Sequence, residues 1–164
     1  MPQNCSTDVS LVVDHVDAVF ANGTEAQQQD LKELFGLGDL EHYDDFAAAL
    51  ENGPWLWQGI QFYTDGGFFE FCDAVESVAP NSTVLPGTDG VGLSKALAGY
   101  ADWFNSTLLP GFCAGYGYED WQGNYSIGCF DTYNTTSPLY TDTSLSNTFD
   151  RQWTWLLCNE RKCR

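Results

Sequence analysis

The sequence predicts a mainly α domain with disulfide-tied irregular loops, and three observations support this. Apolar residues recur every three or four positions in several segments, as on the buried face of an amphipathic helix. Between Pro110 and Asn147 the composition shifts to Gly, Tyr, Ser and Thr, which favours turns. The chain has six cysteines without CxxC or CxxH spacing, so disulfides are a better interpretation than a zinc site.

Helices are expected where the apolar spacing meets capping or breaking residues. Thr24-Glu25-Ala26-Gln27 matches a capping box, and Asn22-Gly23 before it ends the first helix. Asp150 near the start of the last helix suits the helix dipole. The predicted helices cover residues 8–21, 24–36, 39–50, 68–78, 93–108 (expected to be the longest) and 149–159, with an aromatic loop over 51–67 and a Pro/Gly/Asn linker over 79–92.

Length and composition predict one domain over residues 1–164. Hydrophobic residues make up 43% of the chain and aromatic residues 15%, far from the composition of disordered chains. The formal net charge is −17, from 6 Lys and Arg against 23 Asp and Glu. Phosphate backbones and anionic lipids attract clustered cations, so the charge argues against nucleic-acid and membrane partners. Such a surface suits an acidic medium, where carboxylates are partly protonated.

Cysteines and glycosylation sequons together predict a protein of the secretory pathway, because disulfides persist in oxidising compartments. Asn-x-Ser/Thr sequons, each able to accept a glycan, occur at Asn4, Asn22, Asn81, Asn105, Asn124 and Asn134. Residues 1–5 have none of the basic, apolar or cleavage regions of a signal peptide. We therefore expect a fragment, the alternative being a mature protein written without its signal peptide.

No catalytic residue, metal ligand or cofactor is predicted. A Ser-His-Asp hydrolase needs a nucleophile beside a base that a carboxylate orients, and His15 and His42 are the only histidines. Both are expected to be structural or surface residues. Ser94, in Gly-Leu-Ser-Lys-Ala, resembles a nucleophile elbow that lacks its last Gly, so a helix start is the better interpretation.

Acidic pairs leave a second function open. Asp44 with Asp45, and Glu119 with Asp120, invite comparison with glycosidases, but 23 acidic residues produce such pairs by chance. Aromatic and acidic loops can also bind a sugar without cleaving it. A stand-alone secreted binding module, for carbohydrate or protein, is therefore the alternative function.

The most distinctive string is Arg-Gln-Trp-Thr-Trp-Leu-Leu-Cys-Asn-Glu over residues 151–160. Here the chain resembles the serine peptidases that include lysosomal Pro-Xaa carboxypeptidase, lysosomal dipeptidyl peptidase and fungal acid prolyl endopeptidases. It looks most similar to the fungal members, and residues 161–164 form a tail that departs from their pattern. The other matching segments are MPQNCS (1–6), LKELFGL (31–37), FCDAVE (71–76) and ADWFNST (101–107).

The resemblance implies a helical cap domain. In that family the cap is inserted into an α/β-hydrolase core that carries the Ser-Asp-His triad, so this chain resembles a part without the triad. The complete protein would cleave peptides next to proline at acidic pH, in a secreted or vacuolar/lysosomal location. A peptide substrate would meet this chain through the missing hydrolase core. Endo- or exopeptidase activity and the oligomeric state stay open.

The resemblance also implies roles for residues. The expected disulfides are Cys5–Cys72 and Cys113–Cys129, with Cys158 pairing beyond this chain or with Cys163. Trp153, Trp155, Glu160 and Arg151 are the substrate-pocket candidates, with Arg151 as a partner for a carboxylate. Positions 153 and 155 lie about 200° apart on a helix of 3.6 residues per turn. We therefore expect Trp155 to face the pocket and Trp153 to face the core.

Overall fold

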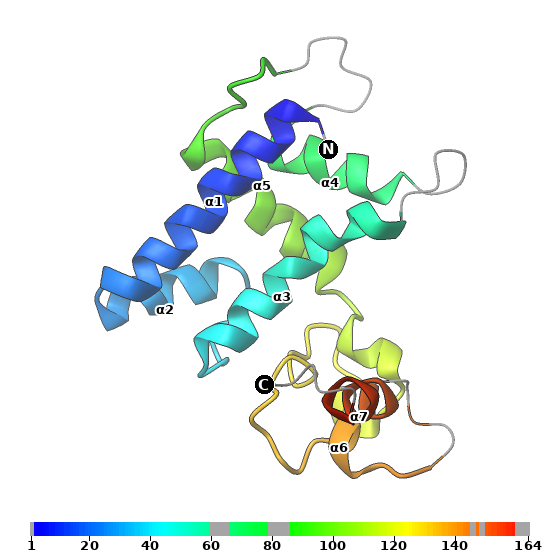
Figure 1. Cartoon of the computed structure of the whole chain (residues 1–164). Coiled ribbons are helices and arrows are strands. Elements are labelled where there is room, and N and C mark those ends of the chain that lie inside the picture. Colours follow the sequence, from blue (N-terminus) through cyan, green and yellow to red (C-terminus); the bar gives the residue numbers. More distant parts are fainter. Residues whose placement is uncertain (1, 60–65, 79–85, 145–146, 148–149, 160–164) are drawn as a thin grey trace.

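The structure is a computed structural model that describes residues 2–59, 66–78, 86–144, 147 and 150–159 (Figure 1). These residues form helices and turns without a β-strand, which confirms the predicted mainly α class. Shorter turns cover Leu56–Gly59, Cys113–Tyr116 and Glu119–Trp121, and a π-helical turn covers Phe104–Leu108. The α-helices are α1 (Gln3–Asn22), α2 (Glu25–Leu34), α3 (Tyr43–Trp55), α4 (Gly67–Val75), α5 (Leu93–Trp103), α6 (Pro138–Thr141) and α7 (Asp150–Asn159).

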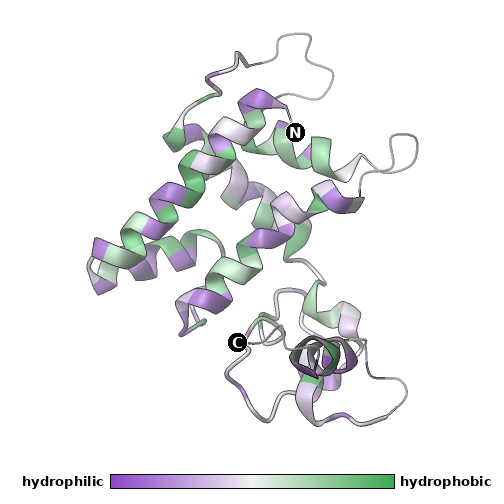
Figure 2. Cartoon of the chain, in the orientation of Figure 1, coloured by the Kyte–Doolittle hydropathy of each residue, from purple (hydrophilic) through white to green (hydrophobic). Residues whose placement is uncertain are grey.

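The chain has two regions, which are drawn one above the other in Figure 1. Helices α1 to α5 and the π-helical turn form the upper region, called the helical bundle below. The described residues from 110 to 159 form the lower region, called the C-terminal lobe, which contains α6 and α7. In Figure 2 the ribbons of α1 and α3 carry both apolar and polar patches, as amphipathic helices do.

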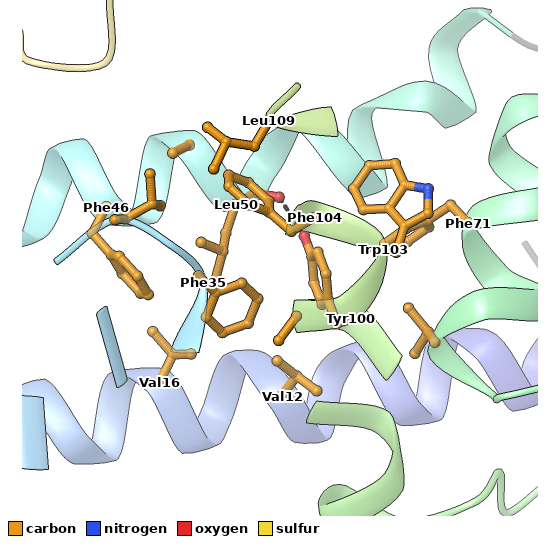
Figure 3. Close-up of a cluster of buried hydrophobic side chains, with 14 of the residues drawn as sticks. Val12, Val16, Phe35, Phe46, Leu50, Phe71, Tyr100, Trp103, Phe104 and Leu109 are labelled. Atoms are coloured by element: carbon orange, nitrogen blue, oxygen red, sulfur yellow. Dashed lines mark hydrogen bonds between the residues drawn. The ribbon is translucent and has the colours of Figure 1, made fainter. Parts of the chain in front are cut away.

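Aromatic rings dominate the core of the helical bundle (Figure 3). Phe35, directly after α2, meets Phe46, Tyr100 and Phe104 edge to face, with ring centroids 5.8, 5.6 and 5.8 Å away. Phe35, Phe46 and Phe104 are fully buried. Edge-to-face pairs add about 1 kcal/mol each beyond burial, so this cluster ties α2, α3 and α5 together.

Helices α1, α4 and α5 approach one another closely. Cys5 of α1 and Cys72 of α4 form a disulfide with a Cα–Cα distance of 5.5 Å, as expected from the resemblance. A Cβ on Gly99 of α5 would lie 2.3 Å from the carbonyl oxygen of Ala74. Only glycine therefore lets α5 pack this closely against α4.

Asp8 connects α1 to the start of α5. Its carboxylate is fully buried and accepts hydrogen bonds from the backbone N–H groups of Val91 (2.9 Å) and Gly92 (3.0 Å). These N–H groups lie just before α5, where helices carry unsatisfied donors and attract negative charge. Gly90 has φ +71°, and a Cβ there would lie 2.4 Å from the Asp8 carboxylate. Asp8 is thus a buried anchor inside α1.

Proline lies inside α3, at Pro54. Proline has no N–H, so it cannot donate to the carbonyl oxygen four residues earlier, which belongs to Leu50. The hydroxyl of Tyr100 in α5 donates to that oxygen instead, and Figure 3 marks this bond. The aromatic core therefore satisfies a carbonyl group that proline leaves without its helical donor.

Aromatic rings and a disulfide form the interior of the described part of the C-terminal lobe. Cys113 and Cys129 form the second expected bridge, with a Cα–Cα distance of 5.3 Å. Phe112 stacks on Phe130 at 4.9 Å, and Phe130 lies 6.5 Å from Phe104 of the bundle. The described lobe residues form short turns here, in agreement with the irregular segment predicted from Pro110 to Asn147.

Polar contacts fasten the lobe to the start of α3. The buried carboxylate of Asp45 accepts hydrogen bonds from the backbone N–H (3.2 Å) and the hydroxyl (2.5 Å) of Thr132. Next to it, the Tyr133 hydroxyl donates to Asp44 at 2.8 Å and lowers the pKa of that carboxyl. The Tyr133 ring also stacks on His42 at 3.6 Å. We call these contacts the α3 latch.

Several helix ends differ from the prediction. Helix α1 starts at Gln3 instead of position 8, so Asp8 lies buried inside the helix. Helix α3 starts at Tyr43 and continues through Pro54 to Trp55, which extends it into the expected aromatic loop. Helix α5 has 11 residues before the π-helical turn, so the longest described helix is α1 with 20. The capping box at Thr24 is confirmed.

Candidate functional site

A hollow of about 550 Å³ lies beside α7 in the C-terminal lobe. Pockets of this size accept small ligands or the side chains of a peptide. One wall comes from α7, and the opposite wall is the segment that follows α6. The lining residues are Asp142, Thr143, Ser144, Arg151, Gln152, Trp155 and Leu156.

Helical spacing brings the α7 residues to this hollow. Arg151 and Trp155 are four residues apart, as are Gln152 and Leu156, so each pair lies on one side of the helix. The Trp155 side chain is 65% exposed and that of Leu156 is 40% exposed. An apolar ring beside a guanidinium group can receive a ligand that has both an apolar ring and a carboxylate, because guanidinium binds carboxylates through two parallel N–H groups.

Asp142 forms the acidic end of the hollow, and its position is fixed by local hydrogen bonds. Its carboxylate accepts the backbone N–H of Ser144 at 2.8 Å and the Tyr118 hydroxyl at 3.1 Å. The bonds from Ser144 are the main cause that lowers its pKa, and Tyr118 and the charge of Arg151 lower it further. A negative group, Asp142, and a positive group, Arg151, therefore lie in the same hollow, so a polar ligand would bind there in one orientation.

The candidate residues fare differently. Arg151 and Trp155 both line the hollow, and their contact with a substrate stays a prediction. The backbone of Trp153 belongs to α7, but its side chain lies outside the described part of the structure, and so do Glu160, Cys163 and the side chain of Cys158. The exposed side chain of Leu156 lines the hollow as well.

Sequence reasoning missed the wall opposite α7. Asp142, Thr143 and Ser144 lie far from the Trp-rich string and carry no motif that points to it. The available signal was Asp142-Thr143-Ser144 itself, because an Asp side chain commonly accepts the backbone N–H two residues later. That signal predicts a turn without telling what the turn packs against.

A larger hollow, of about 830 Å³, lies between α1, α2 and the start of α3. It is lined largely by polar and acidic side chains such as Asp17, Glu25 and Glu41. Its cation, Lys32, already donates to the carbonyl oxygen of Leu40 at 2.7 Å. Asp17 likewise accepts the hydroxyl of Tyr43. The groups that could orient a ligand are thus engaged within the protein, so the hollow beside α7 is the better candidate.

The residues considered for catalysis lie on separate elements. His15 is half-buried in α1, and His42 is stacked on Tyr133 in the α3 latch. Ser94 is exposed in the first turn of α5, which confirms the helix start predicted for that segment. In the described ranges, no group of three His, Cys, Asp or Glu residues is arranged to hold a metal ion. None of the described helices is both long and apolar enough to cross a membrane.

Comparison with known proteins finds two similar proteins that are named serine protease. No family model matches the chain. The chain is 40% identical to serine protease vicPa of the fungus Bipolaris victoriae over 163 residues, and 38% identical to serine protease vicPb of the same fungus over 160 residues. Each alignment covers 97% of this chain but 30% of the relative. The chain therefore spans about a third of the length of these curated relatives, and nearly all of it is similar to them.

Proposed function

We propose that this chain is the helical substrate-covering domain of a secreted serine peptidase that cleaves next to proline at acidic pH. The observation that carries the proposal is the similarity to two proteins named serine protease along 97% of this chain. In this proposal the Ser-Asp-His triad belongs to a hydrolase core outside residues 1–164. The helical domain would limit access to that core and position the peptide.

The hollow beside α7 supplies the chemistry for peptide contact. Proline has a flat apolar ring without a donor, and the exposed face of Trp155 suits such a ring. Arg151, on the same side of α7, suits a peptide carboxylate. Neither group breaks a bond, so the proposed role of the hollow is to orient the substrate.

Two features support work at acidic pH. The formal charge of −17 produces less self-repulsion when carboxylates are protonated. In addition, Glu76 is 5% exposed, and burial together with the nearby charges of Asp8 and Asp73 raises its pKa to about 7. Burying this carboxyl group costs less free energy at low pH, where it is protonated and neutral, than at neutral pH, where it is partly charged.

The first experiment tests whether this chain needs the hydrolase core. The isolated chain is incubated at acidic pH with proline-containing peptides and with a serine-directed fluorophosphonate. We expect neither hydrolysis nor labelling, whereas the complete peptidase should show both. Labelling of a serine within residues 1–164 would overturn the assignment and favour Ser94 as a nucleophile. Carbohydrate binding by the chain, without peptidase activity in the complete protein, would favour the stand-alone binding module.

The second experiment tests the hollow in the complete peptidase. Trp155→Ala should lower kcat/KM for proline peptides about fivefold, because one aromatic contact of roughly 1 kcal/mol is lost. Trp55→Ala is the matched control, since Trp55 is similarly exposed (57%) but lies at the end of α3. Equal effects of the two substitutions would remove the special role of Trp155.

A third variant separates the carboxylate from the ring. Arg151→Gln should weaken binding of peptides with a free C-terminal carboxylate more than binding of the same peptides amidated at that end. A guanidinium group that faces the carboxylate loses a charged hydrogen bond, and the amidated peptide never had one. Equal losses for both peptides would leave Arg151 without this role.

A further inference from the structure

The sequons differ in how their side-chain amides are used, and the chemistry of N-glycosylation makes this difference decisive. A glycan is attached when the Asn Nδ2 bonds to the sugar C1 and the bond from C1 to the pyrophosphate of a lipid-linked oligosaccharide breaks. Nδ2 loses one of its two hydrogens in this step. A folded asparagine that donates both hydrogens to the protein therefore cannot carry a glycan without losing a hydrogen bond.

Asn105 uses both hydrogens. Its Nδ2 donates to the carbonyl oxygen of Leu34, the last residue of α2, at 2.9 Å, and to that of Ala101 in α5 at 2.8 Å. The last carbonyl groups of a helix have no intrahelical donor, so Asn105 caps α2. On its other side, the Asn105 Oδ1 lies only 2.4 Å from the position that a Cβ of Gly36 would occupy. The amide is thus enclosed between α2 and α5.

Asn134 has the opposite arrangement. Its side chain is exposed, and its Oδ1 accepts both the backbone N–H (3.0 Å) and the hydroxyl (2.7 Å) of Thr136, the third residue of the sequon. These two bonds orient the amide through its oxygen, so Nδ2 is not needed to hold the turn. A glycan on Nδ2 leaves both bonds intact.

Asn22 and Asn124 are also exposed. Asn22 ends α1, and its Nδ2 makes one long bond of 3.4 Å to the carbonyl oxygen of Ala18, which leaves its second hydrogen for replacement. Asn124 joins its loop to Gly111 through its backbone carbonyl oxygen, at 2.7 Å, and not through its amide. Asn4 is half-buried and hydrogen-bonds Glu76, so it is left out of the inference, and Asn81 lies outside the described residues.

We infer that the folded chain carries N-glycans at Asn22, Asn124 and Asn134, and that Asn105 stays unmodified as a structural amide that caps α2. The inference rests on the secretory location within the proposed function and not on peptidase activity. The structure thus separates sequons that share one pattern into three glycosylation sites and one asparagine with a structural role.

The test is a mass-spectrometric map of the chain secreted from a eukaryotic host behind an added leader. Glycans are released by peptide N-glycosidase in ¹⁸O water, which converts each occupied asparagine to ¹⁸O-labelled aspartate. We expect the label at positions 22, 124 and 134 and its absence at 105. Label at Asn105 in natively folded protein would overturn the inference, and so would unlabelled asparagine at the three exposed sites. Neither result depends on activity, so peptidase assays judge the proposed function separately.

Two variants distinguish a structural role of the Asn105 amide from a sequon that the host leaves unglycosylated for another reason. Thr107→Val destroys the sequon but keeps the Asn105 amide, and it should leave both the mass of attached glycan and the Tm unchanged. Asn105→Ala removes both hydrogen bonds and should lower Tm by about 5 °C, because the carbonyl groups of Leu34 and Ala101 lose the amide donor of Asn105. A loss of glycan mass in Thr107→Val, or an unchanged Tm for Asn105→Ala, would contradict the structural role.

Discussion

The helical bundle and the C-terminal lobe contain similar aromatic side chains but hold together in different ways. In the bundle, Phe35 alone meets rings from α3, α5 and the π-helical turn, so residues far apart in sequence depend on one another. In the lobe, contacts such as Ser144 to Asp142 and Thr136 to Asn134 span two residues, and one disulfide closes the loop. The comparison teaches that contacts between distant residues hold the bundle together, whereas the lobe consists mainly of local turns joined by a disulfide, the Tyr118–Asp142 bond and the α3 latch.

This difference bears on the candidate site. Arg151 and Trp155 lie in the lobe, on a helix whose described side chains are exposed. Regions with few non-local contacts open at lower free energy than a packed core does. We therefore expect the hollow beside α7 to adjust to a ligand while the bundle stays fixed. The predictions below test this comparison, from the largest expected effect to the smallest.

Removal of each disulfide should have the largest effects. Replacing Cys5 and Cys72 by alanine opens a loop with a sequence separation of 67 and should cost about 4 kcal/mol. Replacing Cys113 and Cys129 opens a separation of 16 and should cost about 3 kcal/mol. Hydrogen exchange should show loss of protection throughout α1 to α5 in the first variant and only in the lobe in the second. Equal loss in both regions for the second variant would mean that the lobe and the bundle unfold as one unit.

Tyr100→Phe tests the helical bundle at a single atom. It keeps the ring but removes the hydroxyl that donates to the carbonyl oxygen of Leu50, so it should lower the free energy of unfolding by about 2 kcal/mol. The control is Tyr125→Phe in the lobe, whose side chain is 64% exposed and which should cost nothing measurable. Urea denaturation at one pH measures both, and a cost of Tyr100→Phe no greater than that of the control would show that the Tyr100 hydroxyl does not stabilise α3.

Glu76 should make the stability of the bundle pH-dependent. Its pKa is about 7 in the folded state against 4.5 as the reference value. A raised pKa favours the protonated form, so the stabilisation is complete below pH 4.5 and is lost as the pH rises to 7. With a discount for solvent screening the loss is roughly 1–2 kcal/mol. Glu76→Gln should flatten Tm against pH over this range, whereas Glu70→Gln, at an exposed position in α4, the helix that ends just before Glu76, should not.

The lobe should respond to acid in the opposite direction. The pKa of Asp142 is lowered by its bonds from Ser144, so its contribution is present above the reference value of 3.8 and is lost as the pH falls below it. Hydrogen exchange at pH 5 and pH 3 should therefore show lobe protection decreasing in acid. Asp142→Asn should remove this decrease, and a lobe whose protection falls equally in the variant would point to other carboxylates.

The smallest expected effect concerns the α3 latch. Asp45→Asn keeps an acceptor for Thr132 but removes its charge, and should cost about 1 kcal/mol. Asp39→Asn is matched in charge and lies at an exposed position just before α3. The latch variant should increase exchange around residues 131–134 more than within α3. If α3 loses protection first, the latch supports the bundle and not the lobe.

Local patterns in the sequence predicted the helices well, because apolar spacing and the capping box at Thr24 act within a few residues. The errors occur where a distant residue decides. Asp8 was read near a helix start, but its partners Val91 and Gly92 lie more than 80 positions away. Pro54 was predicted to lie in the aromatic loop 51–67, but it lies inside α3, where Tyr100 compensates for it. Such pairings leave no periodic trace.

The candidate site was predicted in part for the same reason. The α7 wall follows from spacing within a single helix, so Arg151 and Trp155 could be placed on the same side beforehand. The opposite wall depends on how the chain returns after α6, and Asp142 shows no relation to Arg151 in the sequence. The two bridges came from the resemblance, since six cysteines allow many pairings.

The bond from Tyr100 to Leu50 links the permitted substitutions at two distant positions. Pro54 cannot satisfy the Leu50 carbonyl oxygen, so a relative that keeps this proline needs a hydroxyl at position 100. A relative with phenylalanine at position 100 needs a residue at 54 that has an N–H. Changes at the two positions should therefore compensate each other: Pro54→Ala should recover most of the stability that Tyr100→Phe loses. Among related sequences, positions 54 and 100 should therefore change together.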